Sequence, residues 1–383
     1  MEWTYHNPVK VTFGVEAYRS ISCYVGDRKA LVISTTGFVN RGGLDSLKEI
    51  LGDKIAGVVS NVRPNPDVED MAQLCADSHQ YNFDVIVAIG GGSVIDAAKI
   101  LGAGMGSWGE TPATIRDFLS NGAKVNSGGI KPVIAIPTTA GTGSEVTPFA
   151  TIWDNSLHKK FSIDNPGLYP EVAIVDPKLT YSLPELHTIT TGLDAVSQAF
   201  ESIWNRKASP ATIAIATQSL SYSLKALPLL VWDIRDEKAR NELMAASLLA
   251  GLAISQTRTG IAHSISYPLT AHYGLPHGLA CSFTLPAILE FNLQHDDGRF
   301  AQLASSLGKS GTEELVVCLK RLLGECKIYM RIREYIPSSI AVISLLKEMF
   351  VPERANNNMI PIDYKIVQFF LEKSLESGID ALH

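Results

Sequence analysis

Apolar and polar positions in the first part of the chain follow two alternating patterns. Short apolar runs rich in β-branched residues are predicted strands, at 10–14, 30–34, 56–59, 84–89 and 132–136. Helical periodicity follows over 44–51 and over 68–81, where Asp67 is a candidate N-cap. Runs that are apolar throughout are typical of parallel strands buried on both faces. The alternation therefore predicts a doubly wound α/β domain.

The pattern changes at about Ser182, where the strand-like runs disappear. Long segments with helical periodicity follow at 198–204, 211–226, 239–254 and 364–374. A chain of 383 residues is long enough for two domains with separate cores. We therefore predict an α/β domain over residues 1–181 and an all-α domain over residues 182–383.

Composition and charge argue against some classes of binding partner for this protein. A hydrophobic fraction of 46% with 19% charged residues is that of a well-buried globular protein. The net charge of −6 and the absence of a basic block argue against a nucleic-acid partner. The N-terminal sequence lacks the features of a signal peptide, and no apolar run reaches transmembrane length. We expect a cytoplasmic protein with no membrane partner, whose five scattered cysteines are reduced thiols that fill the core.

Two small-residue loops follow predicted strands. The strand at 84–89 runs directly into Gly90, Gly91, Gly92 and Ser93, which open an Ala-rich segment. Bare backbone N–H groups at the positive end of a helix dipole suit a pyrophosphate, whereas the alternative is a tight turn that binds nothing. The loop 137–147 is rich in glycine and threonine, which suits either close approach of a nucleotide or a solvated loop. Together the two loops favour a nucleotide site.

A second group of residues has the chemistry of a metal site. The stretch 258–278 contains three histidines in an apolar background, among them His263 and His277. A buried imidazole has to satisfy both ring nitrogens, with a metal or with backbone carbonyls. Asp194 and Gln198 are four residues apart on one helical face, and a carboxylate among apolar residues is costly unless it meets a cation. These four side chains form a mixed donor set suited to iron(II) or zinc.

Four motifs together resemble the signature regions of one family. They are GGGSVIDAAK at 90–99, PTTAGTGSEVT at 137–147, TGLDAVSQAFE at 191–201 and IAHSISYPLTAHYGLPHG at 261–278. In this order, across nearly the whole chain, they resemble the iron-containing (group III) alcohol dehydrogenases. The resemblance implies the dehydroquinate synthase-like fold, with an N-terminal Rossmann-like NAD(P)-binding domain and an all-α metal-binding domain. It also implies a homodimer that carries out hydride transfer with NADPH or NADH, while a metal polarises the aldehyde oxygen.

The resemblance also assigns roles to individual residues. It implies that Asp194, His263 and His277 are metal ligands, with Gln198 at the remaining ligand position. The implied cofactor residues are Gly91, Gly92, Ser93, Asp96, Thr138, Thr139, Thr142, Thr147 and, at the nicotinamide ribose, Lys160.

Three departures from the family pattern change these expectations. Gln198 replaces the usual second histidine ligand, and because an amide oxygen is a weaker donor we expect lower metal affinity, with a metal-free site as the alternative. Tyr267 stands where many members have a histidine that relays a proton, so Tyr267, His272 or water is the expected proton carrier. After the strand at 30–34, Thr35 begins a segment without the acidic residue of NAD-using members, so we expect use of NADPH, with NADH as a possible second cofactor.

A fourth departure concerns the substrate. Residues 256–259 are Gln-Thr-Arg-Thr, and Arg258 offers a fork of donors for a bidentate anion, the alternative being an arginine on the surface or paired with an aspartate. This predicts a small anionic aldehyde or alcohol. The segment most resembles the phosphonoacetaldehyde reductase branch, which makes 2-hydroxyethylphosphonate. A short-chain or semialdehyde dehydrogenase, for example of the 4-hydroxybutyrate type, and a metal-free nucleotide-binding protein without turnover are the alternatives.

Overall fold

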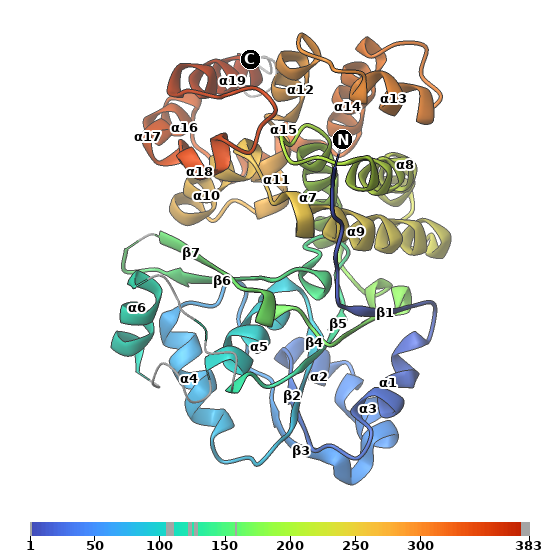
Figure 1. Cartoon of the computed structure of the whole chain (residues 1–383), viewed down its shortest axis with the longest axis vertical. Coiled ribbons are helices and arrows are strands. Elements are labelled where there is room, and N and C mark those ends of the chain that lie inside the picture. Colours follow the sequence, from blue (N-terminus) through green and yellow to red (C-terminus); the bar gives the residue numbers. More distant parts are fainter. Residues whose placement is uncertain (1, 105–110, 122–124, 126–128, 158, 377–383) are drawn as a thin grey trace. The chain divides into compact units, whose positions relative to one another are not determined.

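The computed structural model describes residues 2–104, 111–121, 125, 129–157 and 159–376 (Figure 1). Contacts within the chain divide it into two compact units. The first, called the sheet unit, comprises Asn7–Thr139 and Ser144–Tyr181. The second, called the helical unit, comprises Met1–His6, Ala140–Gly143 and Ser182–His383.

The sheet unit is built on a six-stranded sheet in the order β1-β8-β5-β4-β2-β3, with all neighbouring strands parallel. Its strands are β1 (Lys10–Phe13), β2 (Ala30–Ile33), β3 (Ile55–Val59), β4 (Val85–Gly90), β5 (Val133–Pro137) and β8 (Val172–Val175). The five strands predicted from the sequence are present, with ends shifted by a residue or so, and β8 was not predicted. Because Ala88 pairs with both Ile33 and Ala135, the carboxyl ends of β2, β4 and β5 meet at one edge.

Helices cover both faces of this sheet (Figure 1). Leu31 and Ile33 of β2 pack into one core with α4 and α5, whereas Ala30 and Val32 pack into the other with α1 and α3. The helices are α1 (Ile21–Val25), α2 (Thr36–Asn40), α3 (Gly43–Leu51), α4 (Val68–Ser78), α5 (Gly92–Gly104) and α6 (Pro112–Ser120). Asp67 caps α4 as predicted, through a capping box with Asp70. The doubly wound α/β arrangement is thereby confirmed.

A hairpin of β6 (Phe149–Asp154) and β7 (Lys159–Asp164) adds a separate antiparallel sheet that the sequence pattern did not indicate. The buried Lys99 of α5 hydrogen-bonds the segment that leads into this hairpin. Its Nζ donates to Ser144 Oγ at 3.0 Å and to the carbonyls of Thr147 and Phe149, each at 2.9 Å. Burial lowers the pKa of Lys99 to about 8, although the nearby carboxylates oppose this.

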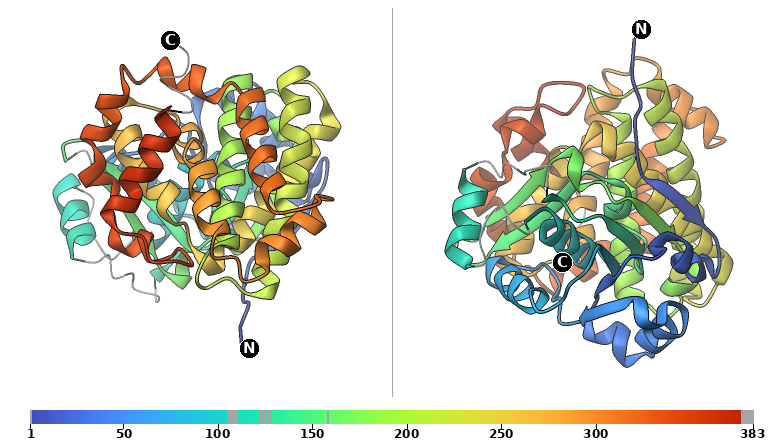
Figure 2. Two further views of the ribbon diagram at one scale, coloured as in Figure 1. Left: turned by 90° about the horizontal axis from the view of Figure 1, so that it is seen from above. Right: turned by 60° about the horizontal axis from the view of Figure 1, so that its bottom comes forward.

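The helical unit surrounds a long buried helix, α7 (Glu185–Ile203), which contacts α8, α9 and α11. Figure 2 shows α8 and α9, coloured light green and yellow, side by side. The others are α8 (Pro210–Trp232), α9 (Glu237–Thr257), α10 (Ile261–Tyr273), α11 (His277–Ser282), α12 (Leu285–Leu293), α13 (Arg299–Ser306), α14 (Glu313–Glu325), α15 (Ile328–Arg333), α16 (Ser339–Ser344), α17 (Leu346–Met349), α18 (Pro352–Ala355) and α19 (Tyr364–Glu376).

One expectation for this unit is wrong. The sequence suggested a helix broken by a turn at Pro268, but α10 continues through it to Tyr273. Proline removes one helical hydrogen bond, and the fully buried Ile265 and Leu269 on either side keep the helix packed. His263 and Tyr267 therefore share one continuous helix.

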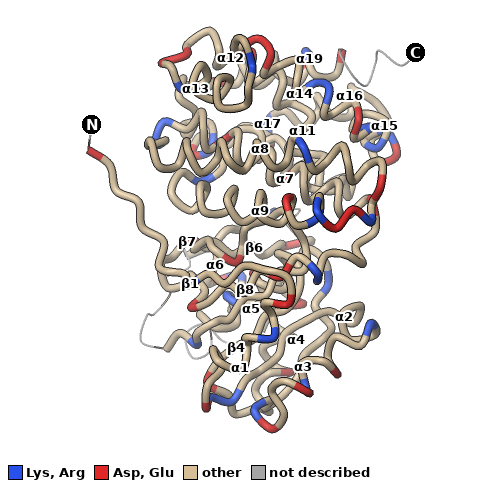
Figure 3. Tube along the Cα trace, turned by 90° about the vertical axis from the view of Figure 1, so that its right-hand side faces the viewer, with Lys and Arg blue, Asp and Glu red and all other residues tan. Residues whose placement is uncertain are grey.

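Charged residues are thinly spread. Lysines and arginines lie among aspartates and glutamates along the described trace in the view of Figure 3, in keeping with the small net charge of −6. Among the described helices, none is both long enough and apolar enough to cross a membrane.

Candidate active site

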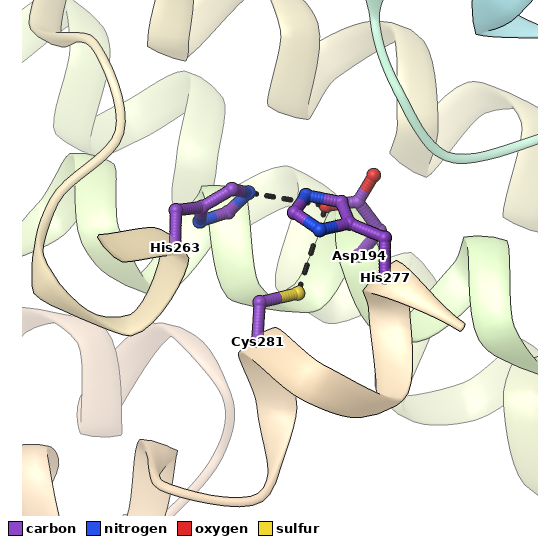
Figure 4. Close-up of side chains that lie close together, drawn as sticks. All are labelled: Asp194, His263, His277 and Cys281. Atoms are coloured by element: carbon purple, nitrogen blue, oxygen red, sulfur yellow. Dashed lines mark hydrogen bonds and ion pairs between the residues drawn. The ribbon is translucent and has the colours of Figure 1, made fainter. Parts of the chain in front are cut away.

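Four potential metal-binding side chains converge in the helical unit (Figure 4). Asp194 comes from α7, His263 from α10, and His277 and Cys281 from α11. One donor atom from each lies within 4.8 Å of all the others. Three of these side chains are buried and His277 is half-buried. Donor atoms around a tetrahedral zinc ion lie roughly 3.4–3.7 Å apart, so small side-chain movements suffice to close this group around a cation.

Close contact between α7 and α11 brings the group together. A Cβ atom on Gly278 would lie 1.7 Å from the carbonyl oxygen of Thr190 and 3.2 Å from the backbone nitrogen of Asp194. Any side chain at position 278 would therefore push α11 away from α7. Glycine at this position allows His277 and Cys281, on either side of it in α11, to approach Asp194.

His263 lies between two buried carboxylates. Its Nδ1 is 2.7 Å from Glu201 Oε2, and its Nε2 is 3.2 Å from Asp194 Oδ1. Glu201 also accepts hydrogen bonds from the backbone N–H groups of Gly260 and Ala262, each at 2.7 Å, at the start of α10. Glu201 accepts a hydrogen bond from Nδ1–H, so the lone pair of a neutral imidazole lies on Nε2. Because Nε2 faces a carboxylate oxygen of Asp194, a proton or a metal cation has to lie between these two atoms.

The charges at this site follow the same geometry. Burial alone disfavours the imidazolium, yet the carboxylates of Glu201 and Asp194 raise the pKa of His263 to about 10. Without a metal, the position between Nε2 and Asp194 therefore holds a proton at neutral pH. A divalent cation takes the place of that proton when it binds.

The hydrogen bonds around His277 also leave one ring nitrogen, Nε2, with a lone pair that can bind a metal. Its Nδ1 is 3.2 Å from Ser266 Oγ, and the Ser266 hydroxyl donates to the carbonyl oxygen of His263 at 2.7 Å. Because that hydroxyl proton is engaged, Ser266 accepts from Nδ1–H, and the lone pair lies on Nε2. The two imidazoles, the carboxylate and the thiol are thus a donor set that fits a divalent metal.

Cys281 is the member of this group that sequence reasoning missed. It was expected to fill core space like the other cysteines. The available signal was its position four residues after His277, the spacing that places Asp194 and Gln198 on one face of α7. Its Sγ is 3.8 Å from Asp194 Oδ1.

Gln198 is buried on the same helix as Asp194. Its Nε2 donates to the carbonyl of Thr142 at 3.3 Å, and its buried Oε1 has no hydrogen-bond partner among the described residues. An unsatisfied buried acceptor costs about 1–3 kcal/mol, which a nearby cation or water would offset. Its role as a ligand stays a prediction.

The two candidate proton carriers lie in different surroundings. Tyr267, four residues after His263 on α10, stacks on His277 with ring centroids 6.0 Å apart and planes at 9°. His272 is exposed and its Nε2 lies 2.8 Å from a carboxylate oxygen of Glu348. It is nine residues from His263, roughly 13 Å along the helix axis and about half a turn around it. The geometry therefore favours Tyr267.

The predicted cofactor loops meet at one edge of the sheet. Gly91 follows β4, and a Cβ atom there would lie 3.3 Å from the side chain of Thr139, which follows β5. The backbone N–H of Thr138 donates to the carbonyl of Gly90 at 2.9 Å. Gly92 begins α5, and Ser93 Oγ accepts from the backbone of Asn65 at 3.1 Å. The carboxyl ends of neighbouring parallel strands are where nucleotides bind in folds of this class.

Thr35 stands at the same edge, after β2. Its hydroxyl accepts from the backbone N–H of Phe38 at 3.2 Å and caps α2. Arg41 ends this short helix, with its Nη1 3.2 Å from the position of a Cβ on Gly37. No carboxylate occurs in the sequence between β2 and Arg41, which agrees with the departure noted above.

The other predicted cofactor residues have different neighbours. Asp96 accepts from Ser144 Oγ and, at 2.9 Å, from the backbone of Thr151. Thr147 is buried, with its carbonyl bound to Lys99. Lys160 lies over the Trp153 ring, 5.8 Å from its centroid, and Thr142 belongs to the helical unit. Their roles in cofactor binding stay predictions.

Arg258 occupies the turn between α9 and α10. It is exposed, with φ 66° and ψ 170°, a backbone conformation that is essentially reserved for glycine. The neighbouring Thr257 is fully buried, and its hydroxyl is bonded to Ser202 and to the carbonyl of Ala253. Thr259 is half-buried, and its hydroxyl accepts from Arg354 Nη1 at 2.7 Å.

Comparison with known proteins agrees with this arrangement. An NAD-dependent methanol dehydrogenase from Bacillus methanolicus is 34% identical over 310 residues, covering 78% of this chain and 79% of that protein. A phosphonoacetaldehyde reductase from Streptomyces viridochromogenes is 36% identical over 260 residues, covering 67% and 65%. The crystal structure of sulfoacetaldehyde reductase from Bifidobacterium kashiwanohense in complex with NAD+ superposes with a TM-score of 0.87 at 29% identity, covering 97% and 98%.

Sequence profiles extend the likeness along the chain. Residues 8–177 match the profile of iron-containing alcohol dehydrogenase, and residues 188–343 match that of the C-terminal region of the same family. The family expected from the four motifs is confirmed. The chain therefore belongs to the iron-containing alcohol dehydrogenase family, and it is an NAD(P)-dependent alcohol dehydrogenase that reduces aldehydes to alcohols.

Proposed function

We propose that this enzyme reduces a small anionic aldehyde, phosphonoacetaldehyde, to 2-hydroxyethylphosphonate with NADPH and a bound divalent metal. The observation that supports the metal part is the group of buried donor atoms in which His263 Nε2 lies 3.2 Å from Asp194 Oδ1. We infer the negative charge of the substrate from Arg258. Because that residue keeps a costly backbone conformation in the turn leading to His263, we infer that its guanidinium is used.

Asp194, His263 and His277 would hold the metal, iron(II) or zinc, with Gln198 as a further candidate ligand. Such an ion supplies Lewis-acid polarisation of a carbonyl oxygen, and the nicotinamide supplies hydride. Glu201 accepts a hydrogen bond from Nδ1–H of His263, which would leave the Nε2 of that ring available as a metal ligand. The Tyr267 hydroxyl, carried by a ring stacked on His277, donates the proton that the alkoxide product needs.

The nucleotide would bind at the carboxyl edge of the sheet, with Gly91, Gly92 and Ser93 at the pyrophosphate. Thr138, Thr139, Thr142, Thr147, Asp96 and Lys160 complete the proposed cofactor set. Near Thr35, the segment after β2 lacks the carboxylate that would repel a 2′-phosphate. The guanidinium of Arg41 lies against Gly37 in the same segment and is a suitable donor for that phosphate.

Replacing Arg41 with glutamine is expected to raise the KM for NADPH about 10- to 100-fold, since hydrogen bonds to charged groups contribute about 1.5–3 kcal/mol. The KM for NADH should change little, because NADH carries no 2′-phosphate. Lys48→Gln, an exposed cation on α3, is the matched control. Steady-state kinetics with both cofactors tests this, and a wild-type enzyme that strongly prefers NADH would contradict the proposal.

The relatives support an anionic two-carbon substrate. Phosphonoacetaldehyde and sulfoacetaldehyde, the substrates in the names of two of the similar proteins, both bear a tetrahedral oxyanion beside a short aldehyde. A guanidinium donates to such an oxyanion through two parallel N–H groups. Arg354, bound to Thr259, offers a second guanidinium near the same turn.

An uncharged short-chain alcohol is the second candidate, favoured by the 34% identity to methanol dehydrogenase. We expect NAD(P)H oxidation with phosphonoacetaldehyde to exceed that with succinic semialdehyde, butyraldehyde or acetaldehyde by at least about tenfold in kcat/KM, equivalent to ~1.4 kcal/mol. The assay is a substrate panel read by NAD(P)H absorbance, with added iron(II) or zinc. A preference for butyraldehyde would move the assignment to the uncharged class, and the absence of turnover would favour a nucleotide-binding protein.

We propose that the enzyme is a cytoplasmic homodimer. The dimer is what the family resemblance implies, and the cytoplasmic location is what the sequence features lead us to expect. Size-exclusion chromatography with light scattering tests the dimer directly.

A further inference from the structure

We infer that the Cys281 side chain is itself a metal ligand, as a thiolate, and that it biases the site toward thiophilic cations such as zinc and cobalt over iron(II) and manganese(II). This inference rests on the metal site of the proposed function. It goes beyond that proposal by naming the donor that decides which metal the enzyme prefers.

The position of the sulfur carries the argument. Cys281 is fully buried, and its Sγ belongs to the group of donor atoms that all lie within 4.8 Å of one another. Figure 4 shows the side chain directed at Asp194 and the His277 ring. It lies one helical turn after His277, so α11 presents both donors on the same face. Gly278, between them, lets this face lie directly on α7.

The thiol lies among several hydrogen-bonding groups. Its Sγ is 3.8 Å from Asp194 Oδ1 and 3.7 Å from the carbonyl oxygen of Gly278, and the hydroxyls of Ser197 and Ser282 also hydrogen-bond to it. A metal ion bound at the centre of the group would displace the thiol proton and make the sulfur a strong donor.

The neighbouring amide is less available than the thiol. Gln198 donates its Nε2 to the Thr142 carbonyl, which restrains the amide, and as a neutral oxygen donor it binds metal more weakly than a thiolate. Two imidazoles, a carboxylate and a thiolate form the mixed tetrahedral set that suits zinc, and zinc accepts a fifth ligand during reactions. A site of oxygen and nitrogen donors alone would distinguish zinc from manganese(II) less strongly.

The experiment is a cobalt(II) titration of the full-length protein after removal of metals with a chelator. Cobalt(II) bound to a thiolate gives an intense near-ultraviolet charge-transfer band, which cobalt(II) bound to nitrogen and oxygen lacks. We expect the band in the wild type, in Gln198→Ala and in the control Cys326→Ser, which alters another fully buried thiol. We expect it to be absent in Cys281→Ser, whose circular dichroism and thermal unfolding verify the fold.

Metal selectivity provides a second measurement that a purely structural role would not move. Competition with a chelator should show that Cys281→Ser lowers zinc affinity by more than the ~10–100-fold cost of losing a hydrogen-bond partner of a ligand. Manganese(II) affinity should fall much less, so the zinc-to-manganese ratio falls at least tenfold, whereas Gln198→Ala should leave it nearly unchanged.

The outcomes separate this inference from the proposed function. A wild type that binds cobalt(II) without the band, a Cys281→Ser variant that keeps it, or an unchanged zinc-to-manganese ratio would each overturn the thiolate ligand and leave the metal enzyme intact. A wild type that binds neither cobalt(II) nor zinc yet reduces aldehydes would overturn the metal site itself.

Discussion

The His277→Ala variant is expected to lose at least about 10³-fold in kcat/KM for its aldehyde substrate, because Lewis-acid stabilisation of the transition state contributes several kcal/mol. The hydrogen bond from Nδ1 to Ser266 directs Nε2 of His277 toward the group that includes Asp194 and His263. Truncation to alanine removes that nitrogen and also the ring that packs against Tyr267. The ion and the proposed proton donor would therefore be disturbed together.

Two measurements accompany the kinetics of His277→Ala. Metal content after dialysis should drop well below that of the wild type, and the melting temperature should change less, since His277 is half-buried. His295→Ala, which removes an exposed imidazole beside Phe291 in the same unit, is the matched control and should keep wild-type activity and metal. Normal turnover by His277→Ala would show that this residue is not needed for activity, and it would contradict the proposed set of metal ligands.

Periodicity predicted the architecture well because burial imposes it directly on the sequence. Every residue of β4 is buried, and the corresponding run is apolar from Val85 to Ile89. The N-cap at Asp67 was also predicted, because capping depends on residues that are close in sequence. The β6–β7 hairpin was missed because four of the six residues of β7 are polar, and because β6 packs against α5, which is distant in sequence. At Pro268, the packing of a buried helix outweighed a local helix-breaking signal.

The candidate site was predictable in part for the same kind of reason. Asp194 and the two histidines are unusual residues in apolar helices, so their positions drew attention. Cysteine is common in cores, so the spacing of four residues between His277 and Cys281 was too weak a signal until the structure placed α11 against α7. The role of Glu201 was likewise not predicted from the sequence. Its contacts with His263 and with the start of α10 span about sixty residues of sequence, a juxtaposition that no local pattern encodes.

Arg258→Gly and Arg258→Ala are expected to reduce kcat/KM for phosphonoacetaldehyde to a similar extent, about 10- to 100-fold, because each removes a charge-assisted hydrogen bond worth about 1.5–3 kcal/mol. Turnover of an uncharged aldehyde such as butyraldehyde should change less than about threefold, roughly 0.6 kcal/mol. Kinetics with the two aldehydes, run in parallel on both variants, measure this difference. Equal losses for both aldehydes would exclude Arg258 from recognition of the anionic group.

The same pair of variants separates recognition from folding. Arg258 has φ 66° and ψ 170°, and strain of this kind costs about 1–3 kcal/mol for a residue with a Cβ. Glycine removes the strain but adds unfolded-state entropy of about 0.5–1 kcal/mol, whereas alanine keeps the strain. The glycine variant should therefore melt at a higher temperature than the alanine variant. If the two differ in stability but lose the anionic substrate equally, the loss comes from the missing guanidinium. If Arg258→Gly raises the melting temperature but lowers activity on the anionic aldehyde, recognition of that substrate would explain why this position has an arginine although the backbone favours glycine.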